Sequence, residues 1–311
     1  MPRPPAPIPT RVACSVRPSL VIFRGTNIVE NATNSKVLFD TAVRQLRPIY
    51  GPDEAEAIAF LIVEKTTHQN RTQILASTPV NLRVTESFER ALNRVARHEP
   101  VQYVLGEAYF FGLSFYVNPS VLIPRPETEM LVDEGMRHVA TLDHPKIVDA
   151  CTGSGCIAIA LRHHLPQAHV TGVDVSDEAL QVARFNAQRL QTPVHWAKLN
   201  VLTEQLPGPI DLLVSNPPYI PASEKEQMAE NVTRYEPGLA LFVPDRDPLV
   251  FYRALAAHAR EHLTTAGRLV TEVHEKLAGQ VATLYTETGL SDVQVKKDLA
   301  GKDRMVTARS A

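Results

Sequence analysis

Apolar positions in the first third of the chain recur at three- and four-residue spacing. From residue 35 to about residue 98 they return in successive stretches, and Pro79 stands between the last two as a helix breaker. Residues three and four apart share one face of an α-helix, so this spacing predicts amphipathic helices that pack on one another. We therefore expect a small helical domain over residues 35–100.

The pattern changes near residue 101. Residues 101–117 are rich in aromatic and β-branched side chains separated by glycines, which is typical of a β-hairpin. Pro124 and Pro126 then bracket Arg125, and because proline restricts φ we expect a stiff, extended segment there. The sequence therefore predicts a β-hairpin connector over residues 101–123.

The remainder of the chain alternates between strand and helix patterns. We predict strands at residues 146–150, 169–175, 194–200, 210–216, 267–274, 291–299 and 304–308, and helices at 127–139, 156–165, 177–190, 248–263 and 276–288. Such alternation is typical of an α/β, Rossmann-like fold, in which helices cover both faces of a parallel sheet. We expect this domain over residues 124–311, with the last two strands closing as a hairpin.

Composition and charge argue against several classes of protein. Among 311 residues, 32 are Lys or Arg and 34 are Asp or Glu, which gives a net charge of −2, so we expect no stable nucleic-acid binding. No apolar run approaches the roughly 18 to 20 residues that span a bilayer, so we expect no membrane insertion. Cys14, Cys151 and Cys156 match no usual zinc spacing, and we interpret them as reduced thiols of a cytoplasmic protein without a metal site.

Residues 1–34 differ from the rest of the chain. They contain four arginines and a single acidic residue, Glu30, and proline is frequent near the start. Basic targeting peptides share this composition, and a disordered leader or an over-long start would also fit. We favour the last two interpretations, because no apolar core precedes a small-residue cleavage site.

A glycine-containing loop follows the first strand of the α/β domain and opens a helix. Glycines remove side chains where a ligand must approach the backbone, and a helix N-terminus offers unpaired N–H groups. Alone, such a loop could equally be an ordinary tight turn. The loop consists of Cys151, Thr152, Gly153, Ser154 and Gly155.

Two later strand ends strengthen the case for a nucleoside site. Asp174 ends the second strand about twenty residues after the glycines, where a carboxylate can accept hydrogen bonds from both ribose hydroxyls or cap the next helix. Asn200 and Val201 end the third strand, where they would bond and pack on an adenine ring, unless Asn200 is a turn residue. Ala158 replaces the last glycine of Gly-x-Gly-x-x-Gly, so a complete dinucleotide motif is absent.

The fourth strand runs into Asn216, Pro217, Pro218 and Tyr219. The prolines fix the backbone and remove two N–H donors, which leaves carbonyls free to accept hydrogen bonds, and the Asn216 side chain adds another carbonyl. Converging acceptors can hold an NH2 group and favour charge developing on its nitrogen, and the tyrosine ring offers a face for a planar group. We therefore predict a catalytic and substrate-binding site for a planar NH2 group here, with Asn216 also bordering the cofactor. An amide and an adenine both satisfy this description.

These motifs resemble the HemK/PrmC family of methyltransferases from about Val37 to the C-terminus. Residues 124–129, Pro-Arg-Pro-Glu-Thr-Glu, are similar to the form carried by family members that methylate peptide chain release factors. Members that methylate a large-subunit ribosomal protein typically carry Pro-Arg-Ser-Pro instead. Residues 234–237, Arg-Tyr-Glu-Pro, and the pair Ala240 and Leu241 also match the family pattern.

The resemblance implies a class I methyltransferase fold and S-adenosylmethionine as the cofactor. It further implies that the acceptor is the glutamine of the release-factor Gly-Gly-Gln motif, that the product is N5-methylglutamine, and that the helical domain recognises the release factor. We expect the protein to act as a monomer. Cys151 stands where the family has glycine, and Asn200 stands where it has an acidic residue. We expect these two departures to affect cofactor affinity.

Two other functions were weighed against this one. An adenine-N6 methyltransferase would use the same tetrapeptide, but it usually carries a DNA-reading domain and flips its base, and the helical domain here has no concentrated basic charge. A non-catalytic binding module would have no reason to retain residues 216–219. A glutamine methyltransferase acting on a ribosomal protein remains an alternative within the family.

Overall fold

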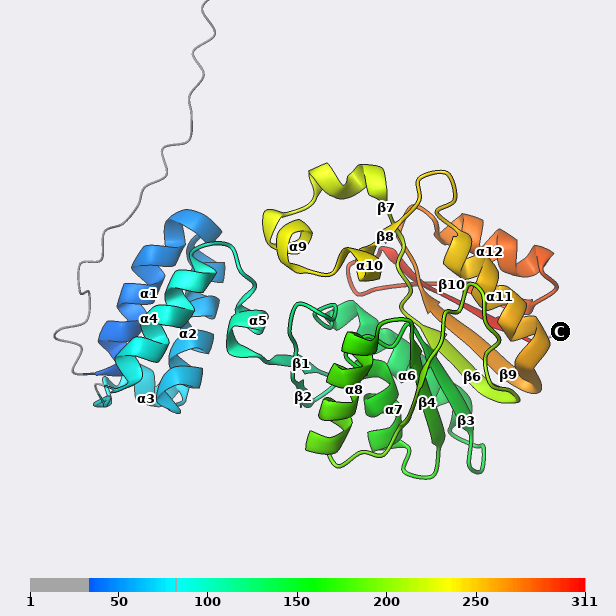
Figure 1. Cartoon of the computed structure of the whole chain (residues 1–311), viewed down its shortest axis with the longest axis horizontal. Helices are drawn as coiled ribbons and strands as arrows, with labels where there is room; N and C mark the ends of the chain where they lie inside the picture. The colour runs from blue at the N-terminus through cyan, green and yellow to red at the C-terminus, as the bar shows by residue number, and fades with distance from the viewer. Residues whose placement is uncertain (1–33, 82, 311) are drawn as a thin grey trace, which may run out of the picture.

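The computed structural model describes residues 34–81 and 83–310, which form an N-terminal helical part and a C-terminal α/β part (Figure 1). The predicted leader, residues 1–34, lies outside the described residues except for Asn34. This asparagine caps the first helix, because its Oδ1 accepts a hydrogen bond from the backbone N–H of Val37 at 3.1 Å.

The helical part buries one apolar core, in which Leu46, Ile62 and Phe88 are fully buried. The rings of Phe39 and Phe60 lie 4.3 Å apart within it. These residues are the apolar positions that recur along the sequence, and their burial stabilises the bundle by about 25 cal/mol per Å². The helices are α1 (Ser35–Tyr50), α2 (Pro52–Thr67), α3 (Arg71–Leu75) and α4 (Arg83–Val95).

The connector begins differently from the predicted hairpin. Its first residues form a short helix, α5 (Val101–Leu105), and the hairpin of β1 (Ala108–Phe110) and β2 (Leu113–Phe115) follows. Pro100, with φ −53°, suits the entrance of a helix, and Gly106, with φ 64°, ends it in the left-handed conformation. The hairpin prediction was therefore wrong for residues 101–105. Their β-branched and aromatic composition favours a strand, but Pro100 and Gly106 begin and end a helix around them.

In the described residues, the α/β part contains a seven-stranded sheet with the order β10-β11-β9-β6-β3-β4-β5. Strands β5, β4, β3, β6 and β9 run parallel, and β11 pairs antiparallel with both β9 and β10. The predicted α/β class and the closing hairpin are confirmed. The strands are β3 (Lys146–Ala150), β4 (His169–Asp174), β5 (His195–Lys198), β6 (Ile210–Ser215), β9 (Leu263–Glu272), β10 (Ser291–Lys297) and β11 (Asp303–Arg309).

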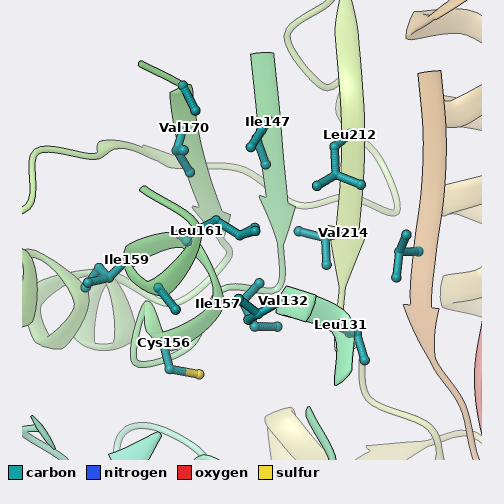
Figure 2. Close-up of a cluster of buried hydrophobic side chains, with 14 of the residues drawn as sticks. Leu131, Val132, Ile147, Cys156, Ile157, Ile159, Leu161, Val170, Leu212 and Val214 are labelled. Atoms are coloured by element: carbon teal, nitrogen blue, oxygen red, sulfur yellow. The ribbon is translucent and has the colours of Figure 1, made fainter. Parts of the chain in front are cut away.

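Helices cover both faces of this sheet. Ile147, Leu212 and Val214 lie on the same side of neighbouring strands and pack against α6 (Glu129–Val139) and α7 (Cys156–His164), as Figure 2 shows. The intervening residues of these strands pack on the opposite face, because successive side chains of a strand point to opposite sides. The other helices are α8 (Asp177–Arg189), α11 (Val250–His262) and α12 (Ala278–Glu287). Within residues 34–81 and 83–310, no helix combines the length and apolar character needed to cross a membrane.

Short elements that the sequence did not predict lie between β6 and α11. Strands β7 and β8 pair in parallel, and a 3-10 turn covers residues 222–227. Elements this short contain too few residues to show a helix or strand period. They are β7 (Ile220–Pro221), α9 (Glu230–Tyr235), α10 (Gly238–Leu241) and β8 (Phe242–Val243).

Candidate active site

A cavity of about 370 Å³ lies at the carboxyl ends of β3, β4 and β6. Strand β3 has β4 on one side and β6 on the other, so the order of the sheet reverses there. Parallel sheets bind ligands at such a reversal, because the loops diverge and leave a crevice. The fold alone therefore marks this position as a ligand site.

Most of the predicted site residues line this cavity. Gly155, Pro217 and Tyr219 are the predicted residues that do not belong to its lining, as far as the described residues show. The predicted residues that line it are Cys151, Thr152, Gly153, Ser154, Asp174, Asn200, Val201, Asn216 and Pro218.

The two glycines of the loop after β3 have different surroundings. A Cβ added to Gly153, whose φ is 54°, would meet nothing within 4 Å, so its backbone is open to a ligand. A Cβ added to Gly155 would lie 2.8 Å from Cη2 of Trp196 and 3.1 Å from Cβ of Ala183. Gly155 is therefore needed for close packing of the loop, and its predicted contact with the cofactor stays a prediction.

Asp149 ties the loop to the strand that precedes it. Its Oδ2 accepts hydrogen bonds from the Thr152 hydroxyl at 2.5 Å and from the Ala158 N–H at 3.1 Å. The carboxyl is fully buried, and burial raises its pKa to about 7 although both hydrogen bonds oppose the rise. Asn186 supports the loop from α8 by donating to the carbonyl of Ser154 at 3.0 Å.

Asp174 is held at the rim of the cavity. Its Oδ2 accepts a hydrogen bond from the Gly153 N–H, and its Oδ1 accepts one from the Ser176 N–H, both at 2.9 Å. Helix α8 is capped by Ser176, whose Oγ accepts from the Ala179 N–H at 3.1 Å. Asp174 is thus not the helix cap, and its carboxylate keeps further lone pairs for hydroxyl groups of a ligand.

The two departures from the family pattern, Cys151 and Asn200, differ in their local surroundings. Cys151 adopts φ 59°, the left-handed region in which glycine is usual. The Oδ1 of Asn200 accepts a hydrogen bond from the Leu202 N–H at 3.0 Å. Because a backbone N–H needs an acceptor, the side-chain oxygen is used in the turn, and the NH2 group is the part of Asn200 that can contact a ligand.

A chain of hydrogen bonds surrounds the end of β6. Asn216 donates through Nδ2 to the Thr128 hydroxyl at 3.1 Å, and that hydroxyl donates to Oε2 of Glu272 at 2.5 Å. The Tyr219 hydroxyl donates to Oε1 of Glu272 at 3.1 Å. Glu272 is 2% exposed, and burial raises its pKa. The sequence reasoning missed Glu272, although an acidic residue at the end of an apolar strand is a usable signal.

The segment after β7 is fastened across the cavity. Arg125 forms an ion pair with the buried carboxylate of Glu236, which also accepts a hydrogen bond from the Ile123 N–H at 3.2 Å. The Tyr235 hydroxyl donates to the carbonyl of Arg97 at 2.9 Å, which joins this segment to the helical part. Leu239, whose side chain remains largely exposed, then lines the cavity with its neighbours.

The site can thus hold an elongated ligand with hydroxyl groups at one end and an NH2 group at the other. Asp174 and the open backbone at Gly153 serve the first end. Asn216 and Pro218 serve the second. The free side-chain oxygen of Asn216 is an acceptor, so this end matches a donor such as an amide NH2.

Comparisons with known proteins cover both parts of the chain. Residues 38–106 match the family described as PrmC N-terminal domain, and residues 128–234 match the methyltransferase small domain. The chain is 40% identical to a release factor glutamine methyltransferase of Flavobacterium psychrophilum over 271 residues, which span 85% of the chain and 95% of the relative. It is also 40% identical to the protein of that name from Bacteroides thetaiotaomicron, over 86% of the chain and 97% of the relative.

A solved structure shares the fold at low sequence identity. It is the hMettl16 catalytic domain in complex with an RNA hairpin, which is 15% identical and has a TM-score of 0.52. The likeness covers 73% of the chain and 81% of that domain. At this identity it supports the class I methyltransferase fold alone.

Proposed function

The chain belongs to the family of release factor glutamine methyltransferases, and we propose that it methylates the glutamine of the Gly-Gly-Gln motif in peptide chain release factors. The methyl group passes from S-adenosylmethionine to the side-chain amide nitrogen, N5. The observation that carries this proposal is that Asn216, held by Thr128, borders the same cavity as Asp174. An acceptor for NH2 hydrogens and an acceptor for ribose hydroxyls therefore face one space.

The residues at the β3 and β4 ends fit S-adenosylmethionine. The carboxylate of Asp174 would accept hydrogen bonds from the ribose hydroxyls, and the open backbone at Gly153 would let the cofactor approach. Asn200 and the buried Val201 would hold the adenine ring through the asparagine NH2 group and apolar contact. When bound, the cofactor supplies an electrophilic methyl group on a positively charged sulfur.

The protein's own contribution to the reaction is positioning. An amide nitrogen is a weak nucleophile because its lone pair is delocalised into the carbonyl, so holding it in line with the methyl group can supply roughly 7 to 11 kcal/mol. The Asn216 side-chain oxygen and the carbonyls beside Pro217 and Pro218 accept the NH2 hydrogens and favour positive charge on that nitrogen. The nitrogen can lose its proton as the methyl arrives or afterwards, so the reaction needs no strong base.

The parts of the chain take separate roles in this proposal. The helical domain, residues 35–100, recognises the release factor, and the connector, residues 101–123, joins it to the catalytic domain, residues 124–311. Contacts such as the ion pair of Lys65 with Glu107, at 2.7 Å, keep the helical domain beside the connector. The protein acts in the cytoplasm, where release factors work in translation. It acts as a monomer and binds no nucleic acid stably.

Methyl transfer to a recombinant release factor tests the proposal directly. Mass spectrometry of the Gly-Gly-Gln peptide should show one added methyl group on the glutamine after incubation with S-adenosylmethionine, and none when cofactor or protein is omitted. Substrates for the alternatives, a large-subunit ribosomal protein and an adenine-containing DNA duplex, should receive no methyl group. Transfer to either of these, with none to the release factor, would overturn the proposal.

A further inference from the structure

We propose that Thr128 and Glu272 are positioning residues that determine which atom of the Asn216 amide faces the methyl-accepting group. This inference rests on the proposed function, because it assigns Asn216 to the acceptor NH2. Thr128 ends the 3-10 turn of residues 126–128, Glu272 is the last residue of β9, and Asn216 follows β6. Three segments distant in sequence therefore meet at one hydrogen-bonded chain.

The hydrogen-bonded series from Asn216 to Glu272 is continuous, and its inner members are buried. Thr128 and Glu272 are each 2% exposed, and Thr128 lies between its two partners, at 3.1 Å from Nδ2 of Asn216 and 2.5 Å from Oε2 of Glu272. The remaining oxygen of Glu272 accepts the Tyr219 hydroxyl at 3.1 Å. Water has little access here, so each side chain depends on the others for its hydrogen bonds.

Glu272 determines which group donates and which accepts in each of these hydrogen bonds. Both oxygens of Glu272 accept hydrogen bonds, Oε2 from Thr128 and Oε1 from Tyr219, so the single hydroxyl hydrogen of Thr128 is used on Glu272. The Thr128 oxygen can then only accept, and it takes its hydrogen from the amide of Asn216. The NH2 group of Asn216 is thereby turned inward, and its oxygen is left to face the cavity.

Burial and the neighbours of Glu272 act on its pKa in opposite directions. Burial raises the pKa of Glu272, while the Thr128 and Tyr219 hydroxyls and the positive charge of Arg304 oppose that rise. An amide turned the other way would set the NH2 of Asn216 against the NH2 of the acceptor, which places donor against donor. Only one of the two orientations of the Asn216 amide is therefore expected to support methyl transfer.

Substitutions that keep shape but change polarity test this assignment. Glu272→Gln can place an NH2 group against Thr128, which frees the hydroxyl to donate to Asn216 and turns the amide over. Thr128→Val removes the link without changing the volume greatly, and Thr128→Ser retains the hydroxyl. Thr283→Val is the matched control, because Thr283 is exposed on α12, outside the site.

We expect Glu272→Gln and Thr128→Val to lower kcat by about 100-fold, comparable to loss of one group that stabilises a transition state. Cofactor Kd from calorimetry should stay close to wild type, and thermal unfolding should show that each variant is folded at the assay temperature. Thr128→Ser should restore most of kcat, and the double variant Thr128→Val with Glu272→Gln should be no slower than the slower single variant, because both act through Asn216. A release-factor peptide with glutamate in place of the glutamine should inhibit Glu272→Gln more strongly than wild type, since the overturned amide donates.

Heteronuclear NMR of the Asn216 side-chain NH2 measures the orientation without any acceptor. Its hydrogens should exchange slowly with solvent in wild type and Thr128→Ser, and quickly in Thr128→Val and Glu272→Gln. Fast exchange in wild type, or normal kcat in both disrupting variants, would overturn the inference. So would a loss of kcat in Thr128→Ser as large as in Thr128→Val, which would mark a steric role. Failure of wild type to methylate release factors would instead remove the proposed function, and the exchange measurement would still decide the inference.

Discussion

Two buried carboxyl groups, Asp149 and Glu272, support the two ends of the cavity in contrasting ways. Asp149 accepts its hydrogen bonds from Thr152 and Ala158, which follow it by three and nine residues. Glu272 accepts its hydrogen bonds from Thr128 and Tyr219, which are 144 and 53 residues away. The loop after β3 at the cofactor end is thus tied to its own strand and helix, whereas the acceptor end exists only when three separate segments are assembled.

This difference predicts that cofactor binding and methyl transfer depend on different sets of contacts. The cofactor loop is held by hydrogen bonds close in sequence, but the acceptor site depends on how β6, β9 and the turn before α6 meet. Substitutions at the cofactor end should therefore act on cofactor affinity, and substitutions at the acceptor end on turnover. The predictions below test that separation.

The largest effect is expected from Asn216→Ala. Loss of the amide removes an acceptor for the NH2 hydrogens of the glutamine, so kcat should fall by about 10² to 10³-fold, or roughly 3 to 4 kcal/mol. Cofactor Kd from calorimetry should change little, because the Asn216 side chain is bound to Thr128 on the acceptor side. A large rise in cofactor Kd would place Asn216 at both ends of the cavity and end the proposed separation.

The second effect is expected from Asp174→Ala. Loss of one or two charge-assisted hydrogen bonds to the ribose should raise cofactor Kd by roughly 100-fold, which corresponds to about 2.7 kcal/mol. At saturating cofactor, kcat should remain near wild type. Asp177→Ala is the control, because it removes an exposed carboxylate three residues further along. An equal rise in Kd for both variants would mean that overall charge, not the ribose contact, is responsible.

The third effect is a dependence of stability on pH that comes from Asp149. Its folded pKa is about 7 and its ordinary value is 3.8, so between these values the folded protein keeps a proton that the unfolded chain has lost. Stability from this group therefore falls as pH rises, by about 2 kcal/mol between roughly pH 5 and pH 6.5. Urea unfolding of the cofactor-free protein should show a shallower fall in Asp149→Asn than in wild type.

The matched substitution for Asp149 is Asp143→Asn, because the Asp143 side chain is 92% exposed. It should leave the pH dependence as in wild type. Titration of the Asp149 carboxyl by carbon NMR gives the folded pKa directly, even if Asp149→Asn fails to fold. An observed pKa near the ordinary value would show that the local end of the cavity does not carry a buried proton.

The same contrast explains what the sequence could predict. The long strands and helices could be predicted because their apolar positions recur, and the place of Asp174 at the cavity could be predicted because it ends a buried strand at a characteristic distance from the glycines. The packing role of Gly155 could not be predicted, since it depends on Trp196 from another strand. Thr128 lies inside the Pro-Arg-Pro-Glu-Thr-Glu motif of residues 124–129, but only the fold brings its partner Glu272 beside it.

The segment between β6 and α11 shows the same limit. Elements of two to six residues carry no period, and their conformation is determined by contacts such as the ion pair of Arg125 with Glu236. Arg125 and Glu236 are 111 residues apart, and nothing in either local sequence indicates the other. When a site is built from contacts between distant segments, the sequence predicts only those segments that carry a recognisable motif. Residues 216–219 are such a segment.

The smallest effect is expected at Cys151, where a local property alone should decide the outcome. A non-glycine residue at φ 59° costs about 1 kcal/mol, and Cys151→Gly removes that strain, although it also removes contacts of a half-buried side chain with the core. We expect a gain of about 1 kcal/mol or less in unfolding free energy from urea titration, and a clear loss in Cys151→Val, whose branched side chain suits this conformation poorly. Cofactor Kd should remain within about threefold of wild type, because the open backbone lies at Gly153. If Cys151→Gly were less stable than wild type, packing of the thiol against the core would outweigh the backbone strain at this position.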